Sequence, residues 1–166
     1  MHDVVNRLIA IKREIQTKSS SAEVVAVSKT FPMTKILPLI NHGHKHFGEN
    51  KVQEAIEKWT SVKEDFVEIK LHLIGKLQTN KVKYAVPLFD YIHSLDSQKL
   101  ADVCAKTQNS INKSIKYFIQ VNLGNETQKS GISFSEVDAF YNYCVMEKKL
   151  NILGLMAIPP NDNNTE

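Results

Sequence analysis

The feature that most constrains the fold of this chain is a regular alternation of short apolar runs with longer amphipathic segments. The apolar runs are rich in β-branched and other large apolar residues, which favour buried strands. Together with the two short, more polar segments 45–47 and 90–93, they predict six strands, over 24–28, 45–47, 69–74, 90–93, 117–121 and 152–156. Helically spaced apolar residues predict helices before and between them, over 3–17, 33–42, 51–59, 78–85, 97–109 and 136–148. This order is typical of a parallel α/β sheet.

Two α/β architectures are compatible with an alternation of this kind. A dinucleotide-binding sheet is disfavoured because no GxGxxG motif follows the first predicted strand. The spacing suits a (β/α)8 barrel of the TIM type equally well. Such a barrel needs two more strands, so we expect residues 1–166 to form a single domain that covers only about strands 1 to 6 and is incomplete at its C-terminus. Pro38 lies inside the helix predicted over 33–42, which therefore begins later or is kinked.

Composition excludes several classes of function. The 21 basic residues are interleaved with 18 acidic ones for a formal charge of +3, which gives no strong electrostatic case for nucleic-acid binding. No apolar run reaches the roughly 18 residues of a membrane span, and the polar start is unlike a signal peptide. Cys104 and Cys144 lie far apart, indicate neither a disulfide nor a zinc site, and are expected to be buried. We therefore expect a cytoplasmic protein that binds no membrane.

Lys29 is the candidate nucleophile, because it stands directly after the apolar run over 24–28. A lysine at the end of a buried strand can be partly removed from water, which favours the neutral amine that attacks carbonyl carbons. The alternative is an ordinary lysine whose charged end reaches solvent.

Polar side chains at the other strand ends form a candidate binding site, because these ends meet at one face of a barrel. The candidates are Asn50, His72, Ser94, Gln120, Asn122 and Met156. With an amine beside them, such groups suit a polar carbonyl compound. Each has an alternative: Asn50 can cap the next helix, His72 can be a hydrogen-bonded core residue, and Met156 can simply pack. His42, His44 and His46 lack further ligands at a diagnostic spacing, so no metal site is predicted.

Several linked motifs occur in a characteristic order. They are Ala-Val-Ser-Lys-Thr over 26–30, Phe-Gly-Glu-Asn-Lys-Val-Gln-Glu over 47–54, His-Leu-Ile-Gly-Lys-Leu-Gln-Thr-Asn-Lys over 72–81, Ser-Leu-Asp-Ser over 94–97, Gln-Val-Asn over 120–122, Lys-Ser-Gly-Ile over 129–132 and Gly-Leu-Met over 154–156. Over essentially all of residues 1–160 the sequence resembles the YggS/PROSC family of pyridoxal phosphate homeostasis proteins.

The resemblance implies a barrel of the alanine-racemase type without that enzyme's second domain. It also implies that Lys29 holds pyridoxal 5'-phosphate as a Schiff base, and Lys129 matches a family lysine proposed to take part in cofactor transfer. The implied function is homeostasis of this reactive aldehyde, without clear catalytic turnover. Because an imine is reversible, the aldehyde could be released from Lys29 and handed on transiently to apoenzymes that depend on pyridoxal phosphate.

Two departures from the family pattern bear on this expectation. Phe31 replaces a second lysine that the family often has two residues after the Schiff-base lysine. The family's C-terminal segments, which supply the phosphate cup, have no counterpart in these 166 residues, so we expect weak binding of the cofactor or none. Two other functions remain open: a racemase-like or decarboxylase-like enzyme on the same barrel, and a cofactor-free module that binds through the basic segment 76–83.

Overall fold

The computed structural model describes residues 2–123 and 130–158, and it contains all six predicted strands. A seventh strand, β6, was not predicted because it has only two residues. The strands are β1 (Ala26–Val27), β2 (His46–Glu49), β3 (Lys70–Leu73), β4 (Tyr91–Leu95), β5 (Lys116–Asn122), β6 (Ile132–Ser133) and β7 (Asn151–Ala157).

The predicted helices are also present, with shifted ends. They are α1 (Asp3–Lys18), α2 (Met33–Asn41), α3 (Val52–Asp65), α4 (Val82–Leu88), α5 (Gln98–Ser110) and α6 (Val137–Asn142). A 3-10 turn, Thr79–Lys81, leads into α4, and a π-helical turn, Tyr143–Glu147, continues α6. Pro38 lies within α2, which begins at Met33, so the alternative that this helix begins later is wrong.

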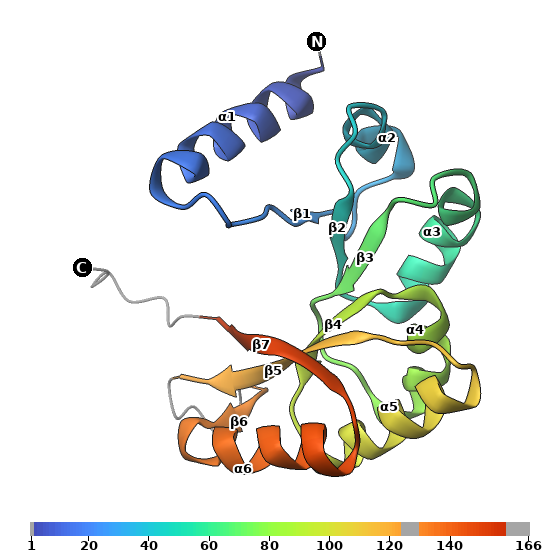
Figure 1. Cartoon of the computed structure of the whole chain (residues 1–166). Coiled ribbons are helices and arrows are strands. Elements are labelled where there is room, and N and C mark those ends of the chain that lie inside the picture. The colour runs from blue at the N-terminus through green and yellow to red at the C-terminus, as the bar shows by residue number, and fades with distance from the viewer. Residues whose placement is uncertain (1, 124–129, 159–166) are drawn as a thin grey trace.

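The strands form one parallel sheet, which confirms the predicted fold class. Its order is β1-β2-β3-β4-β5-β6, and β7 also pairs with β5. Among the described residues, β1 pairs only with β2 and β7 only with β5, so no pairing closes the barrel. Figure 1 shows β1 and β7 at opposite ends of the curved sheet, with the helices α3, α4 and α5 along one side of it.

The two faces of the sheet differ in composition because side chains alternate along each strand. The face toward the helices carries the fully buried core, which includes Phe47, Leu71 and Leu73 packed with Trp59 of α3. The opposite, inner face carries polar side chains, among them His46 and His72. Burial of the helix-facing side chains therefore stabilises the sheet against the helices, and the inner face is free to carry polar groups.

Both cysteines are buried in the core, as predicted, and neither forms a disulfide. Burial raises the pKa of Cys104 to about 12, so its thiol stays protonated and unreactive at neutral pH. In residues 2–123 and 130–158, no helix is long and apolar enough to cross a membrane.

Candidate functional site

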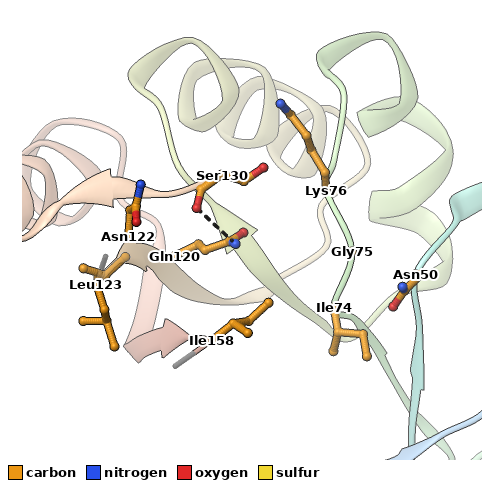
Figure 2. A pocket seen from close by; sticks show the side chains of 10 residues that line it. Asn50, Ile74, Gly75, Lys76, Gln120, Asn122, Leu123, Ser130 and Ile158 are labelled. Atoms are coloured by element: carbon orange, nitrogen blue, oxygen red, sulfur yellow. Dashed lines mark hydrogen bonds between the residues drawn. The ribbon is translucent and has the colours of Figure 1, made fainter. Parts of the chain in front are cut away.

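A pocket of about 300 Å³ opens at the carboxyl ends of β2, β3 and β5 (Figure 2). In parallel α/β sheets this is the end at which ligands bind. The pocket is lined by residues at or just after the ends of three strands, namely Asn50, Ile74, Gly75, Lys76, Gln120, Val121, Asn122 and Leu123, together with Ser130 and Ile158.

The pocket brings together three of the predicted candidates, Asn50, Gln120 and Asn122, of which Asn50 and Asn122 lie 72 positions apart in the sequence. Gln120 also faces the pocket and donates from Nε2 to the Ser130 carbonyl oxygen at 3.5 Å. Lys76 supplies a positive charge, and none of the described residues that line the pocket carries a carboxylate. Amide and ammonium groups of this kind suit an anionic or carbonyl-bearing ligand.

Lys29 lies in the turn that follows β1, with its side chain exposed. It is not one of the residues that line the pocket. Val27 pairs with Gly48, so Lys29 and Asn50 each stand two positions beyond a paired residue on neighbouring parallel strands. The Ser28 N–H also donates to the Gly48 carbonyl at 2.9 Å, which extends this pairing past the end of β1. Lys29 and the pocket therefore lie at the same end of the sheet, where the strands have their carboxyl ends.

The other predicted site residues that the structure describes do not line this pocket. His72 and Ser94 are buried within the sheet, and the Ser94 hydroxyl has no hydrogen-bond partner among the described residues. Met156 is half-buried on β7, where it pairs with Gln120. Lys129 lies outside the residues that the structure describes. Asn50 is not a helix cap, because α3 begins at Val52 with Lys51 as its N-cap.

Three histidines on neighbouring strands form a hydrogen-bonded row, here called the histidine ladder. His46 Nδ1 lies 2.9 Å from His72 Nε2, and His72 Nδ1 lies 2.9 Å from His93 Nε2. The His72 ring also stacks on Tyr91, with centroids 4.2 Å apart, and His93 stacks on Phe118 at 4.4 Å. His72 is thus a hydrogen-bonded core residue, in agreement with the structural alternative considered for it.

The histidines that are close in sequence do not act together. His44 Nε2 lies 2.8 Å from the His46 carbonyl oxygen, whereas the His46 ring faces His72. His42 is exposed and forms the C-cap of α2. In the described part of the chain, no three His, Cys, Asp or Glu side chains are arranged to hold a metal ion.

Two glycines allow the pocket walls to approach closely. A Cβ at Gly75 would lie 2.2 Å from the Asn50 carbonyl oxygen and 2.8 Å from its Cα. At Gly131, where φ is +118°, a Cβ would lie 2.8 Å from the Asn122 backbone nitrogen. Each glycine therefore contacts the backbone of a pocket-lining residue, where no side chain fits.

Replacing Gly75 by alanine is expected to push the Asn50 backbone out of place and to cost about 1–3 kcal/mol of stability, as overpacking does. The matched control is Gly154→Ala in β7, where the nearest atoms are side-chain carbons of Phe118 at 3.7 Å. Thermal unfolding of both variants measures the difference. Equal melting temperatures for the two variants would show that the Asn50 backbone yields without cost.

The fold and pocket define an α/β protein of the open-barrel type with a candidate ligand site at the strand carboxyl ends. The chain belongs to the family described as "Alanine racemase, N-terminal domain", which matches residues 6–166. A pyridoxal phosphate homeostasis protein of Aquifex aeolicus is 38% identical over 145 residues, which are 87% of this chain and 63% of that protein. The corresponding protein of Haemophilus influenzae is 33% identical over 99% of this chain and 73% of its own length.

Solved structures agree with these sequence matches. PipY of Synechococcus elongatus PCC7942, in a structure with PLP bound, superposes with a TM-score of 0.86 at 33% identity, over 98% of this chain and 73% of that one. Alanine racemases share the fold at only 8–14% identity. The resemblance to the pyridoxal phosphate homeostasis proteins is confirmed, although the chain spans less than two thirds of the length of the Aquifex aeolicus relative.

Proposed function

We propose that this chain binds pyridoxal 5'-phosphate through Lys29 and serves to hold and release it. The observation that carries the proposal is the superposition on PipY, whose structure has PLP bound, over 98% of this chain. The names of the curated relatives favour homeostasis of the cofactor over turnover of a substrate.

The residues at the strand ends fit such a cofactor. Lys76, Asn50 and Asn122 offer an ammonium group and side-chain amides at a pocket of about 300 Å³, as an anionic phosphate ester requires. Lys29 follows the neighbouring strand end and offers the amine. Among residues 2–123 and 130–158, no carboxylate in the pocket lining would repel an anion.

The bound cofactor supplies an aldehyde. In the proposed step the Lys29 nitrogen attacks the aldehyde carbon, a C=N bond replaces the C=O bond, and one water leaves. The bond is covalent yet hydrolysable, so the same residue both retains the aldehyde and returns it by the reverse reaction. Transfer to apoenzymes that depend on the cofactor is the proposed use of this reversibility.

A racemase-like or decarboxylase-like reaction is the alternative function. The likeness to alanine racemases lies at 8–14% identity and concerns the fold alone. We therefore propose a carrier without turnover. Incubation of the loaded protein with L-alanine, followed by chiral chromatography, is expected to yield no enzyme-dependent D-alanine.

Borohydride reduction tests the proposed bond directly. The protein is mixed with an excess of pyridoxal 5'-phosphate, reduced, digested and mapped by mass spectrometry. We expect one dominant phosphopyridoxyl label, on the peptide that contains Lys29. Lys29→Arg is expected to remove this label, because a guanidinium stays protonated and forms no imine under these conditions.

The matched control is Lys18→Arg, which replaces an exposed lysine in the last turn of α1. This variant is expected to retain the label on Lys29 in full. Label spread evenly over exposed lysines, or unchanged total label in Lys29→Arg, would show that Lys29 is not the binding residue.

A further inference from the structure

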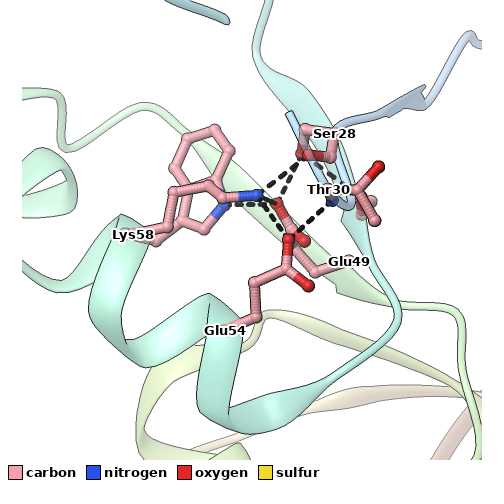
Figure 3. Close-up of polar contacts among 7 residues, drawn as sticks. Ser28, Thr30, Glu49, Glu54 and Lys58 are labelled. Atoms are coloured by element: carbon pink, nitrogen blue, oxygen red, sulfur yellow. Dashed lines mark hydrogen bonds and ion pairs between the residues drawn. The ribbon is translucent and has the colours of Figure 1, made fainter. Parts of the chain in front are cut away.

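The two peptide groups that flank Lys29 are both held by side chains of α3. The Ser28 carbonyl, which belongs to the peptide before Lys29, accepts a hydrogen bond from Lys58 Nζ at 2.9 Å. The Thr30 N–H, which belongs to the peptide after Lys29, donates to Glu54 Oε1 at 2.6 Å. The backbone on each side of the Lys29 Cα is therefore fixed to the same helix (Figure 3).

The two holding side chains are joined to each other and to the core. Lys58 Nζ lies 2.9 Å from Glu54 Oε1 and 2.9 Å from Glu49 Oε1. Glu49 is fully buried and also accepts hydrogen bonds from Ser28 Oγ at 2.8 Å and Trp59 Nε1 at 2.9 Å. The pair of Lys58 and Glu54, called here the Lys58–Glu54 clamp, is thus anchored in the packed interior.

The held segment has a strained conformation. Thr30 has a φ of +64°, in the left-handed region that a β-branched residue rarely adopts. Such strain persists only where surrounding contacts determine it, and it is concentrated at functional sites. Here the Thr30 N–H bond to Glu54 is one of those contacts. β1 itself has only two residues, so the clamp adds restraint that the strand alone does not give.

Both charges of the clamp are maintained at neutral pH. The hydrogen bond from Lys58, followed by that from Thr30, lowers the pKa of Glu54. Burial works against the Lys58 ammonium, but its hydrogen bonds to Glu54 and Glu49 outweigh burial and raise its pKa. The clamp is therefore fully charged under ordinary conditions.

We propose that Lys58 and Glu54 are positioning residues that fix the direction in which the Lys29 side chain leaves the end of β1. This inference rests on the proposed function of Lys29. A lysine side chain is long and flexible, so the direction of its Cα–Cβ bond decides which volume the amine searches. Fixing that direction raises the rate of bond formation with a ligand already held in the pocket.

The proposal predicts separate effects on two steps of binding. The first step is non-covalent occupation of the pocket, measured as a dissociation constant. The second is imine closure, measured as a rate at saturating pyridoxal 5'-phosphate from the growth of the imine absorbance band. The clamp touches the peptides beside Lys29 and does not line the pocket. Its loss therefore slows closure and leaves the dissociation constant unchanged.

Glu54→Gln is the informative variant, because it removes the charge and retains a similar shape. It is expected to slow closure about tenfold, in line with the cost of misplaced reacting groups. Glu57→Gln is the matched control, since Glu57 is exposed on the same helix and bonds only to Gln53 among the described residues. Lys58→Arg keeps the positive charge and is expected to retain most of the closure rate.

The outcomes separate the clamp from a purely structural role. If Glu54 only supports the fold, Glu54→Gln lowers the melting temperature, raises the dissociation constant and lowers the closure rate, and this outcome overturns the proposal. Equal closure rates in Glu54→Gln and Glu57→Gln would overturn the proposal, and so would a loss confined to the dissociation constant.

A second measurement applies if the unaltered protein forms no imine at Lys29. That result contradicts the proposed function, and the clamp is then judged by hydrogen exchange of the Thr30 amide. Exchange that is at least about tenfold faster in Glu54→Gln than in Glu57→Gln supports the clamp, because the Thr30 N–H has lost its charged acceptor. Equal exchange overturns it.

Discussion

Lys58→Met is expected to lower the free energy of unfolding by about 3–5 kcal/mol, the cost of removing one partner of a buried ion pair. The Lys58 side chain is 11% exposed and that of Glu49 is fully buried. Methionine preserves much of the packing of the lysine stem but leaves the Glu49 carboxylate without its cation. The released Ser28 carbonyl also loses a hydrogen-bond donor.

Urea denaturation of three variants measures this effect. Lys106→Met is the control, because Lys106 is an exposed lysine of α5 and its replacement should change stability by less than about 0.5 kcal/mol. Glu49→Gln combined with Lys58→Met is expected to recover a large part of the loss, since no unpaired buried charge remains. A loss below about 1 kcal/mol in Lys58→Met would mean that water reaches Glu49 and replaces the lysine.

The order of strands and helices could be predicted from the sequence because apolar periodicity determines it. All six predicted strands are present, and helix α1 ends one residue beyond the prediction. Boundaries were less accurate where side-chain patterns do not mark them. Of the five residues predicted as a strand over 24–28, only two form β1. The strand β6 has only two residues, which is too short for a periodic pattern.

The pocket could be predicted in part, because strand ends of a parallel sheet converge. Asn50 and Asn122 were selected in this way and both line the pocket. The same rule selected Ser94, but position after a strand does not show which way a side chain faces. Its buried hydroxyl contributes nothing to the pocket lining.

The clamp and the histidine ladder could not be predicted, because both depend on contacts between distant segments. Lys58 is 30 residues from the Ser28 carbonyl that it holds, and Glu54 is 24 residues from Thr30. Members of the ladder are 26 and 21 residues apart and meet only through the register of β2, β3 and β4. The local cluster of His42, His44 and His46 gave a stronger sequence signal but does not form a unit.

The histidine ladder is expected to make the protein increasingly unstable as the pH falls below about 6.5. Burial, with smaller contributions from the charges of His93 and His46, lowers the pKa of His72 to about 3. Burial lowers the pKa of His93 to about 4. Well above pH 6.5 these histidines are neutral in the folded and unfolded states alike, so they cause no pH dependence there.

Between pH 6.5 and about 4 the unfolded chain takes up protons at these positions and the folded protein does not. Stability therefore falls with the pH through this window, and the slope ends only when the ladder itself becomes protonated. The total loss over this window is on the order of a few kcal/mol.

The test compares slopes of unfolding free energy against pH, from urea denaturation between pH 8 and pH 4. His72→Gln combined with His93→Gln retains hydrogen-bonding groups that do not titrate, so its curve should be flatter by a few kcal/mol over the window. His42→Gln replaces an exposed histidine and should follow the unaltered protein. A constant loss of stability in the double variant does not affect this comparison, because only the difference in slope reports protonation. Parallel curves for the double variant and the unaltered protein would mean that the ladder opens to water before its rings are protonated.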